Sequence, residues 1–283
     1  MIERLKMLSE LVKFEHSIFA LPFAFAGALI AGNGSVSFIK LFWIFVAMNG
    51  AYISAMALNR IIDEAIDARN PRTSGRALPM GDISRMGVWL IVIISLASFF
   101  WSAYSLNISC LYLAPVALVL LSIYSYTKRF TSLCHLYLGF TLSAAPVGAY
   151  MAVTPEFTLI QMVLAWCVMF WVAGFDIIYA CQDIEFDRSN GIHSIPAVRG
   201  MYGALIISRL MHFFTIAGFI VAGFLIAARY PYYIAIAISS ALLAYEHSLL
   251  KDGSLDKVDI AFFQVNGYVA VIFIAGVMAN YYL

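Results

Sequence analysis

The sequence predicts an all-α, polytopic integral membrane protein. Of its 283 residues, 63% are hydrophobic and only 12% are charged, and the mean hydropathy is +0.89. A soluble globule of this length cannot bury so many apolar side chains, so lipid must be the solvent for much of the surface. Apolar runs recur from end to end without a polar linker, and we therefore expect a single domain over residues 1–283.

Nine apolar stretches are candidates for membrane-crossing helices, each of which needs about 20 mostly apolar residues. They cover residues 17–32, 38–58, 86–106, 110–126, 133–153, 159–181, 204–228, 232–250 and 260–283. The first stretch is short, and we expect it to extend back through Phe14. We therefore predict nine transmembrane helices.

The positive charges lie mostly on one side of the predicted membrane. With nine spans, all but three of the 17 Lys and Arg residues fall on the side of the N-terminus, the exceptions being Lys40, Arg209 and Arg229. The positive-inside rule makes this side cytoplasmic and puts the C-terminus outside. Both long connections, 59–85 and 182–203, lie on the cytoplasmic side, so we expect the functional site there. The net charge of +1 indicates no nucleic-acid partner.

The first long connection begins with three oxygen-bearing side chains at helical spacing. If the second span continues as a helix to a natural stop before Pro71, then Asn59, Asp63 and Asp67 share one face at positions i, i+4 and i+8. A solvated polar turn would also produce such a pattern, so this cluster alone is weak evidence for a site.

The second long connection repeats the pattern. Tyr179, Asp183 and Asp187 have the same spacing on one predicted helix face, and Gly191 supplies a helix stop. Four predicted crossings separate the two clusters, so both return to the same membrane face. We expect a weak parallel internal repeat, relating residues 38–153 to residues 159–283.

Twin carboxylates in two related positions predict a magnesium and diphosphate site. Mg²⁺ prefers hard oxygen ligands and usually bridges a few carboxylates to substrate phosphates. Cations near the clusters could meet phosphate oxygens or a carboxylate, although positive-inside anchoring also explains them. These cations are Arg72, Arg76, Lys128 and Arg129.

Two acidic residues, one inside a predicted span and one near a span end, are expected to have different roles. Asp176 lies about two turns before Asp183 inside a span, and we expect it to support the site because a charge is costly in hydrocarbon. Glu246 lies near a span end, and we expect it to be solvated.

At these residues the sequence resembles the UbiA superfamily of intramembrane aromatic prenyltransferases. The first motif reads Asn59-x3-Asp63-x3-Asp67-x4-Arg72-Thr73-x2-Arg76. The second motif reads Asp176-x2-Tyr179-x3-Asp183-x3-Asp187-x3-Gly191-x2-Ser194-x-Pro196. A weaker match is Lys128-Arg129-x-Thr131. One departure from the pattern is Arg60, which occupies a position that is often acidic in the superfamily.

The resemblance implies nine transmembrane helices around a central cavity, capped by the two cytoplasmic connections, in a bacterial-type inner (plasma) membrane. It implies that Mg²⁺ is held through diphosphate by the catalytic residues Asp63, Asp67, Asp183 and Asp187. Substrate-binding residues would be Asn59, Arg72, Arg76, Lys128, Arg129, Tyr179, Asp176 and Ser194.

The branch looks like the 4-hydroxybenzoate polyprenyltransferases. The implied reaction transfers a polyprenyl group from polyprenyl diphosphate to the ring carbon ortho to a hydroxyl of a small aromatic acid, either 4-hydroxybenzoate or a hydroxynaphthoate, in ubiquinone or menaquinone biosynthesis. Alternatives are another acceptor class in the same superfamily and a membrane transporter. The acidic pairs gather at one face, and no span centre is broken by Gly or Pro beside a charge, which argues against transport.

Overall fold

The computed structural model describes residues 2–12, 17–250 and 255–283, and this part of the chain is helical and contains no strand. Each of the nine predicted stretches is helical. They correspond to α2 (Ser17–Ala31), α3 (Phe38–Asp67), α5 (Arg85–Leu106), α6 (Ile108–Thr127), α7 (Cys134–Val153), α8 (Leu159–Ala180), α10 (Ile195–Leu225), α11 (Tyr230–Leu249) and α12 (Asn266–Tyr282).

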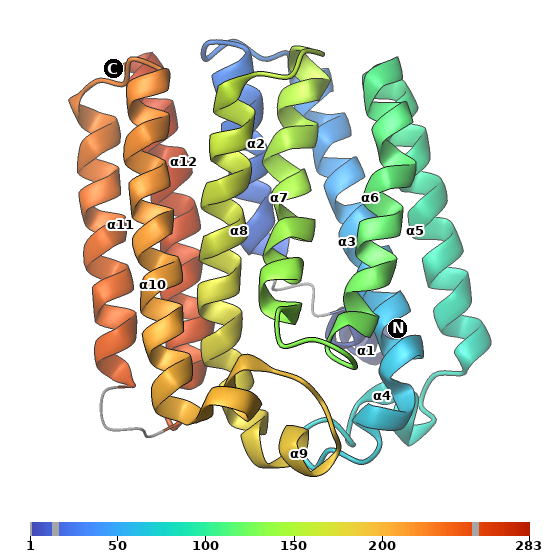
Figure 1. The fold of residues 1–283 in the computed structure, drawn as a ribbon. Coiled ribbons are helices and arrows are strands. Elements are labelled where there is room, and N and C mark those ends of the chain that lie inside the picture. The colour runs from blue at the N-terminus through green and yellow to red at the C-terminus, as the bar shows by residue number, and fades with distance from the viewer. Residues whose placement is uncertain (1, 13–16, 251–254) are drawn as a thin grey trace.

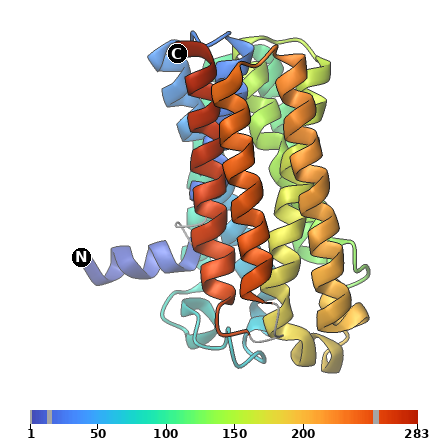
Figure 2. The ribbon, with the colours of Figure 1, turned by 90° about the vertical axis from the view of Figure 1, so that its left-hand side faces the viewer.

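These helices run side by side as one bundle, and the short elements gather at one end of it (Figure 1). The short elements are α1 (Ile2–Val12), α4 (Ala77–Met80), the 3-10 turn η2 (Cys181–Asp183), α9 (Ile184–Ser189) and the π-helical segment η3 (Ile260–Val265), which leads into α12. The C-terminus lies at the opposite end. Helix α1 projects sideways from the bundle (Figure 2).

Seven helices in the described part are long and apolar enough to cross a membrane: Phe38–Asp67, Arg85–Leu106, Ile108–Thr127, Cys134–Val153, Leu159–Ser189, Ile195–Leu225 and Ile260–Tyr282. Helix α2 is apolar but shorter, and α11 is not among the seven. Phe14, through which the first span was expected to extend, lies outside the described residues, as do the predicted cytoplasmic cations Lys13 and Lys251. The count of nine crossings stays a prediction, as does the internal repeat.

The end of α3 and the start of α10 are both set by local sequence signals. Helix α3 continues to Asp67, as predicted, and stops before Pro71. Helix α10 begins at Ile195, earlier than the predicted residue 204, because the Ser194 hydroxyl accepts a hydrogen bond from the Ala197 amide and Pro196 occupies the first turn. Gly200, with φ of 70°, then kinks the helix.

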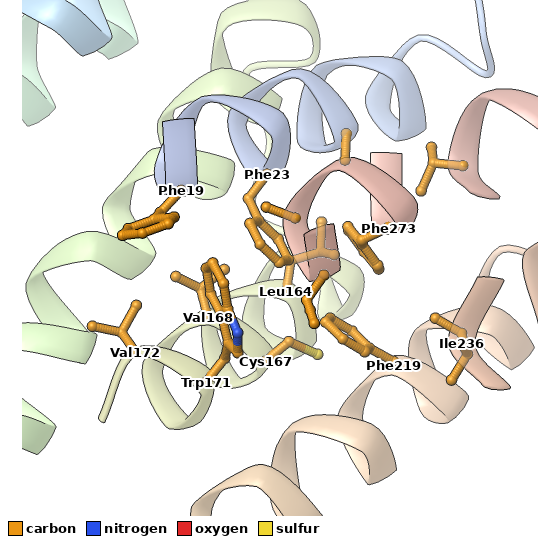
Figure 3. Packing of buried hydrophobic residues seen from close by; sticks show 14 of the residues in the cluster. Phe19, Phe23, Leu164, Cys167, Val168, Trp171, Val172, Phe219, Ile236 and Phe273 are labelled. Atoms are coloured by element: carbon orange, nitrogen blue, oxygen red, sulfur yellow. The ribbon is translucent and has the colours of Figure 1, made fainter. Parts of the chain in front are cut away.

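Aromatic side chains fill one half of the bundle, where α2, α8, α10 and α12 meet (Figure 3). Phe23 packs against Trp171 and Phe273, with ring centroids 4.7 and 4.8 Å apart. Phe219 stacks on Phe273 at 4.4 Å. Each such ring buries a large apolar area, so this half holds the main hydrophobic core of the described residues.

The other half of the bundle, around α3, α6 and α7, is lined by small side chains. Gly139 packs directly on the backbone of α8, since an added Cβ would lie 2.1 Å from the Met169 carbonyl oxygen. By contrast, a Cβ on Gly148 would meet nothing within 4 Å. Small residues therefore bring α7 close to α8 on one face and leave open space on the other.

A buried polar network lies beside the aromatic core. Glu246 is completely buried, which corrects the expectation that it is solvated. The amide of Asn266 donates to Glu246 Oε1 at 2.8 Å, and Asn266 Oδ1 accepts from Trp171 Nε1 at 2.7 Å. Helix α11 turns Glu246 inward to meet the start of α12, a tertiary contact that proximity to a span end does not reveal.

Candidate active site

A cavity of about 480 Å³ opens at the end of the bundle that carries the short elements. Its walls come from α2, α3, α5, α6, α7 and α8, and its polar end is formed by both long connections. The size lies in the range of small-molecule sites. The predicted site residues that line it are Asn59, Asp63, Asp67, Arg72, Arg76, Lys128, Asp176, Tyr179, Asp183, Asp187 and Ser194.

The first motif places its three predicted side chains along one face of α3. Asn59 donates from Nδ2 to Asp63 Oδ2 at 2.8 Å and to Ser125 Oγ at 3.2 Å. Asp63, which is 1% exposed, also accepts from Lys128 Nζ at 2.6 Å. The buried Asp67 accepts from Arg76 Nη1 at 2.6 Å. Both carboxylates are thus paired with cations at the mouth of the cavity.

The second motif departs from the continuous helix that the sequence predicts. Helix α8 ends at Ala180, the 3-10 turn η2 follows, and α9 resumes at Ile184. Asp187 accepts a hydrogen bond from Ser194 Oγ at 2.7 Å and is buried. Gly191 adopts φ of 66° beyond the end of α9, as expected of a helix stop. Because of this tighter turn, Tyr179, Asp183 and Asp187 do not share one face of a continuous α-helix, but both aspartates still line the cavity.

Arg72 joins the two connections directly. Its Nε donates to Asp183 Oδ1 at 3.0 Å, its Nη2 binds Asp183 Oδ2, and its Nη1 donates to the Tyr179 hydroxyl at 3.0 Å. Asn70 donates to Asp183 Oδ1 at 2.9 Å. Burial by itself would lower the pKa of the Arg72 guanidinium, but the hydrogen bonds and charges of Asp183 and Tyr179 raise it above its usual value. The two motifs therefore meet at one place.

Lys128 and Arg129 differ in position although they are adjacent in the sequence. Lys128 lines the cavity, whereas Arg129 is not among its lining residues. Arg129 donates to the Ile62 carbonyl oxygen at 2.6 Å and lies 3.5 Å from Asp63 Oδ1. Arg129 therefore supports α3 from outside the cavity wall.

Asp176 pairs with a buried histidine, His135, that sequence reasoning missed. Its Oδ2 lies 2.7 Å from Nδ1 of His135 at the start of α7, and His135 Nε2 accepts from the Ile195 amide at 3.3 Å. When Nε2 accepts from this amide, the ring proton is on Nδ1, where it is donated to Asp176 Oδ2. The histidines are dispersed in the sequence, so only the packing of α7 on α8 reveals the pair.

Asn70 and Arg60 also line the cavity without having been predicted as site residues. Asn70 could have been found, because it precedes Pro71 at the point where α3 ends and its Oδ1 caps the turn by accepting from the Arg72 amide at 2.9 Å. Arg60 follows Asn59 directly and so is not part of the i, i+4, i+8 pattern of the acidic face, which left it without a distinguishing pattern.

The donor set fits a magnesium ion that shares its ligands with a substrate. Within the described residues, no group of three or more His, Cys, Asp or Glu side chains is arranged to hold a metal ion alone. Four carboxylates nevertheless line one cavity mouth, in pairs on α3 and around η2 and α9. Mg²⁺ is commonly held by one or two carboxylates together with substrate phosphates, so a site completed by diphosphate agrees with this arrangement.

Comparison with known proteins decides the family. A sequence model described as the UbiA prenyltransferase family matches residues 20–274. The chain belongs to the UbiA prenyltransferase family. It is therefore a prenyltransferase, as the resemblance of its two aspartate motifs implied.

Relatives and solved structures agree with the UbiA assignment. A 4-hydroxybenzoate octaprenyltransferase of Haemophilus ducreyi is 30% identical over 257 residues, which cover 90% of this chain and 92% of that protein. The apo structure of a UbiA homolog from Aeropyrum pernix superposes with a TM-score of 0.86 at 33% identity, covering 94% of this chain and 98% of the other. A UbiA homolog from Archaeoglobus fulgidus, solved bound to DMAPP and Mg²⁺, superposes with a TM-score of 0.75 at 19% identity. The superposition covers 96% of this chain and 98% of that one.

Proposed function

We propose that this UbiA-family enzyme transfers a polyprenyl group from polyprenyl diphosphate to the ring carbon ortho to a hydroxyl of an aromatic acid, with Mg²⁺ as cofactor. The observation that carries the proposal is the meeting of both aspartate motifs at the mouth of one cavity. The name of the H. ducreyi relative and the ligands of the A. fulgidus structure support the acceptor class, the donor class and the metal.

Diphosphate would bind between the two motifs. Asp63 and Asp67 on α3, and Asp183 and Asp187 after α8, would hold Mg²⁺ together with the phosphate oxygens. When bound there, Mg²⁺ supplies Lewis-acid stabilisation of the charge that develops on the leaving group. Asn59 would orient Asp63, and Ser194 would orient Asp187, through the hydrogen bonds already described.

The cations at the mouth would add to this stabilisation. Lys128, Arg72 and Arg76 each pair with one of the motif carboxylates. A bound diphosphate offers these cations new oxygen partners, and guanidinium groups bind such anions in bidentate fashion. The stabilisation is greatest when the allylic carbon–oxygen bond breaks, because the diphosphate then carries the electron pair of that bond.

The apolar part of the cavity suits the rest of the reaction. Once the carbon–oxygen bond breaks, the allylic carbon bonds to the electron-rich ring and the ring loses a proton. Water would quench the allylic cation, so the cavity must exclude it. Leu113, Ala117, Leu138 and Ala145 give the wall an apolar surface along which a hydrocarbon tail could lie. Tyr179 and Asp176 would complete the polar side of the acceptor site.

We further propose that the chain forms one domain with nine crossings in a bacterial-type inner membrane. The active-site end and the N-terminus would face the cytoplasm and the C-terminus the outside, because the cationic connections lie at the site end and the C-terminus at the other. The two long connections would then cap the cavity from the cytoplasm.

An acceptor panel tests the proposed reaction. Purified protein in detergent is incubated with geranyl diphosphate, Mg²⁺ and either 4-hydroxybenzoate or a hydroxynaphthoate, and products are identified by mass spectrometry. A ring-prenylated acid supports the proposal and identifies the acceptor. Absence of product with every aromatic acid, while prenyl transfer to another acceptor class is detected, would overturn it.

A further inference from the structure

Arg60 is a buried cation that the proposed diphosphate site does not use. It lies on α3, lines the cavity and is 4% exposed. Its position is three residues before Asp63 and seven before Asp67, which places it about one and two helical turns deeper in the bundle. The backbone of Arg60 therefore lies deeper than both carboxylates, and its side chain reaches toward the mouth, where Nη1 is 3.8 Å from Asp67 Oδ2.

The other cationic side chains of the cavity each have a carboxylate partner. Lys128 binds Asp63 and Arg76 binds Asp67, both at 2.6 Å, and Arg72 binds Asp183. For Arg60, the nearest carboxylate oxygen in the described part of the chain is Asp67 Oδ2, 3.8 Å from Nη1, which is beyond hydrogen-bond distance.

The hydrogen bonds of Arg60 leave much of its guanidinium available. Within the described residues, Nε donates to the Leu11 carbonyl oxygen at 2.9 Å, and neither Nη group has a hydrogen-bond acceptor. An arginine carries five N–H donors, and a buried charge whose only ion pair is a long one without a hydrogen bond is incompletely compensated. An anion bound in the cavity would complete that compensation. Met56, Tyr52 and Tyr124 line the same region and give an aromatic ligand an apolar surface.

We propose that Arg60 binds the carboxylate of the aromatic acceptor and so selects acids over uncharged phenols. This inference rests on the proposed prenyl transfer to an aromatic acid and adds the residue that recognises the acid. The Nη groups would hold the carboxylate oxygens, while the diphosphate occupies the mouth with Arg72, Arg76 and Lys128. The two anionic groups of the two substrates would thus be bound by different cations of one cavity.

The test compares an acid with its uncharged analogue. The acceptors compared are 4-hydroxybenzoate and 4-hydroxybenzamide, or, if the enzyme uses a hydroxynaphthoate, that acid and its carboxamide. The value of kcat/KM for each acceptor is measured in the wild type, Arg60→Lys, Arg60→Met and the control Arg85→Met. Arg85 is exposed and pairs with Glu64 at 3.0 Å, away from the cavity. We expect the wild type to prefer the acid by about 10- to 100-fold, the range for a charged hydrogen-bonded pair.

Arg60→Met is expected to lose this preference through a higher KM for the acid. Arg60→Lys, which keeps the charge, should retain part of it, and Arg85→Met should retain it all. The inference would be overturned if the ratio of kcat/KM for the acid to kcat/KM for the amide were the same in Arg60→Met as in the wild type. Such a result, including an equal loss with both acceptors, is expected of a residue that only supports Asp67. A wild type that prenylates neither aromatic acid would instead refute the proposed function.

Discussion

The carboxylate of Asp183, at the end of the second motif's 3-10 turn, is bound through both of its oxygens by the guanidinium of Arg72, which follows the first motif. These residues are far apart in the sequence, and the contact brings the two long connections together over the cavity. Asn70 strengthens it by donating to the same carboxylate at 2.9 Å. Substrate diphosphate would meet both motifs at this junction.

Loss of either central aspartate should stop turnover. Asp63→Ala and Asp183→Ala are expected to lower kcat/KM by about 100-fold or more, because each removes a carboxylate that would bind the metal and stabilise the leaving group. Steady-state kinetics with geranyl diphosphate measure the effect. Glu185→Ala is the matched control, since Glu185 lies between Asp183 and Asp187 but is exposed. Wild-type turnover in either aspartate variant would remove that residue from the site.

The geometry of Arg72 should matter as well as its charge. Arg72→Lys keeps the positive charge but cannot bind Asp183 through two nitrogens, so we expect kcat/KM for the donor to fall by about tenfold. Arg69→Lys provides the comparison, because Arg69 is exposed and its Nε donates to the Ala65 carbonyl oxygen of its own helix at 3.1 Å. Equal activity in the two variants would show that the bidentate contact has no part in donor binding.

Metal removal should be reversible. EDTA is expected to abolish product formation, and added Mg²⁺ to restore it, because the proposed leaving-group stabilisation depends on an ion that the motif carboxylates and the diphosphate hold together. Product formation is followed by chromatography before and after readdition. Full activity in the chelator would contradict a metal-bridged site.

Two glycines of α7 should respond oppositely to the same substitution. Gly139→Ala places a Cβ 2.1 Å from the Met169 carbonyl oxygen and should destabilise the protein by about 1–3 kcal/mol, as overpacking does. Gly148→Ala meets nothing within 4 Å and should leave stability unchanged or raised, since alanine favours helices. Thermal unfolding in detergent compares them, and a lower melting temperature for Gly148→Ala alone would contradict the packing described for α7.

Local sequence patterns predicted the elements that carry the first motif. Pro71 marks where α3 stops, so the shared face of Asn59, Asp63 and Asp67 followed from helical periodicity. The start of α10 was missed although its signal was present, because Ser194 and Pro196 form a helix start that a search for apolar runs ignores.

Contacts between helices were beyond the reach of the sequence. His135 and Asp176 meet only because α7 packs on α8, and Glu246 is buried only because α11 turns it toward Asn266. The 3-10 turn between Tyr179 and Asp187 likewise leaves no mark in the spacing of the motif. Spacing along one helix is local, whereas these features depend on which helices become neighbours.

An experimental structure with geranyl thiodiphosphate, a slowly reacting donor analogue, and Mn²⁺ in place of Mg²⁺ would show whether both aspartate motifs bind one diphosphate. Anomalous scattering would locate the metal ions. We expect metal peaks about 2.1 Å from carboxylate oxygens of both motifs, with the diphosphate between Asp63 and Asp183. Metal bound to one motif alone, or a diphosphate outside the cavity lined by these two aspartates, would contradict the claim that the motifs act together on a single donor.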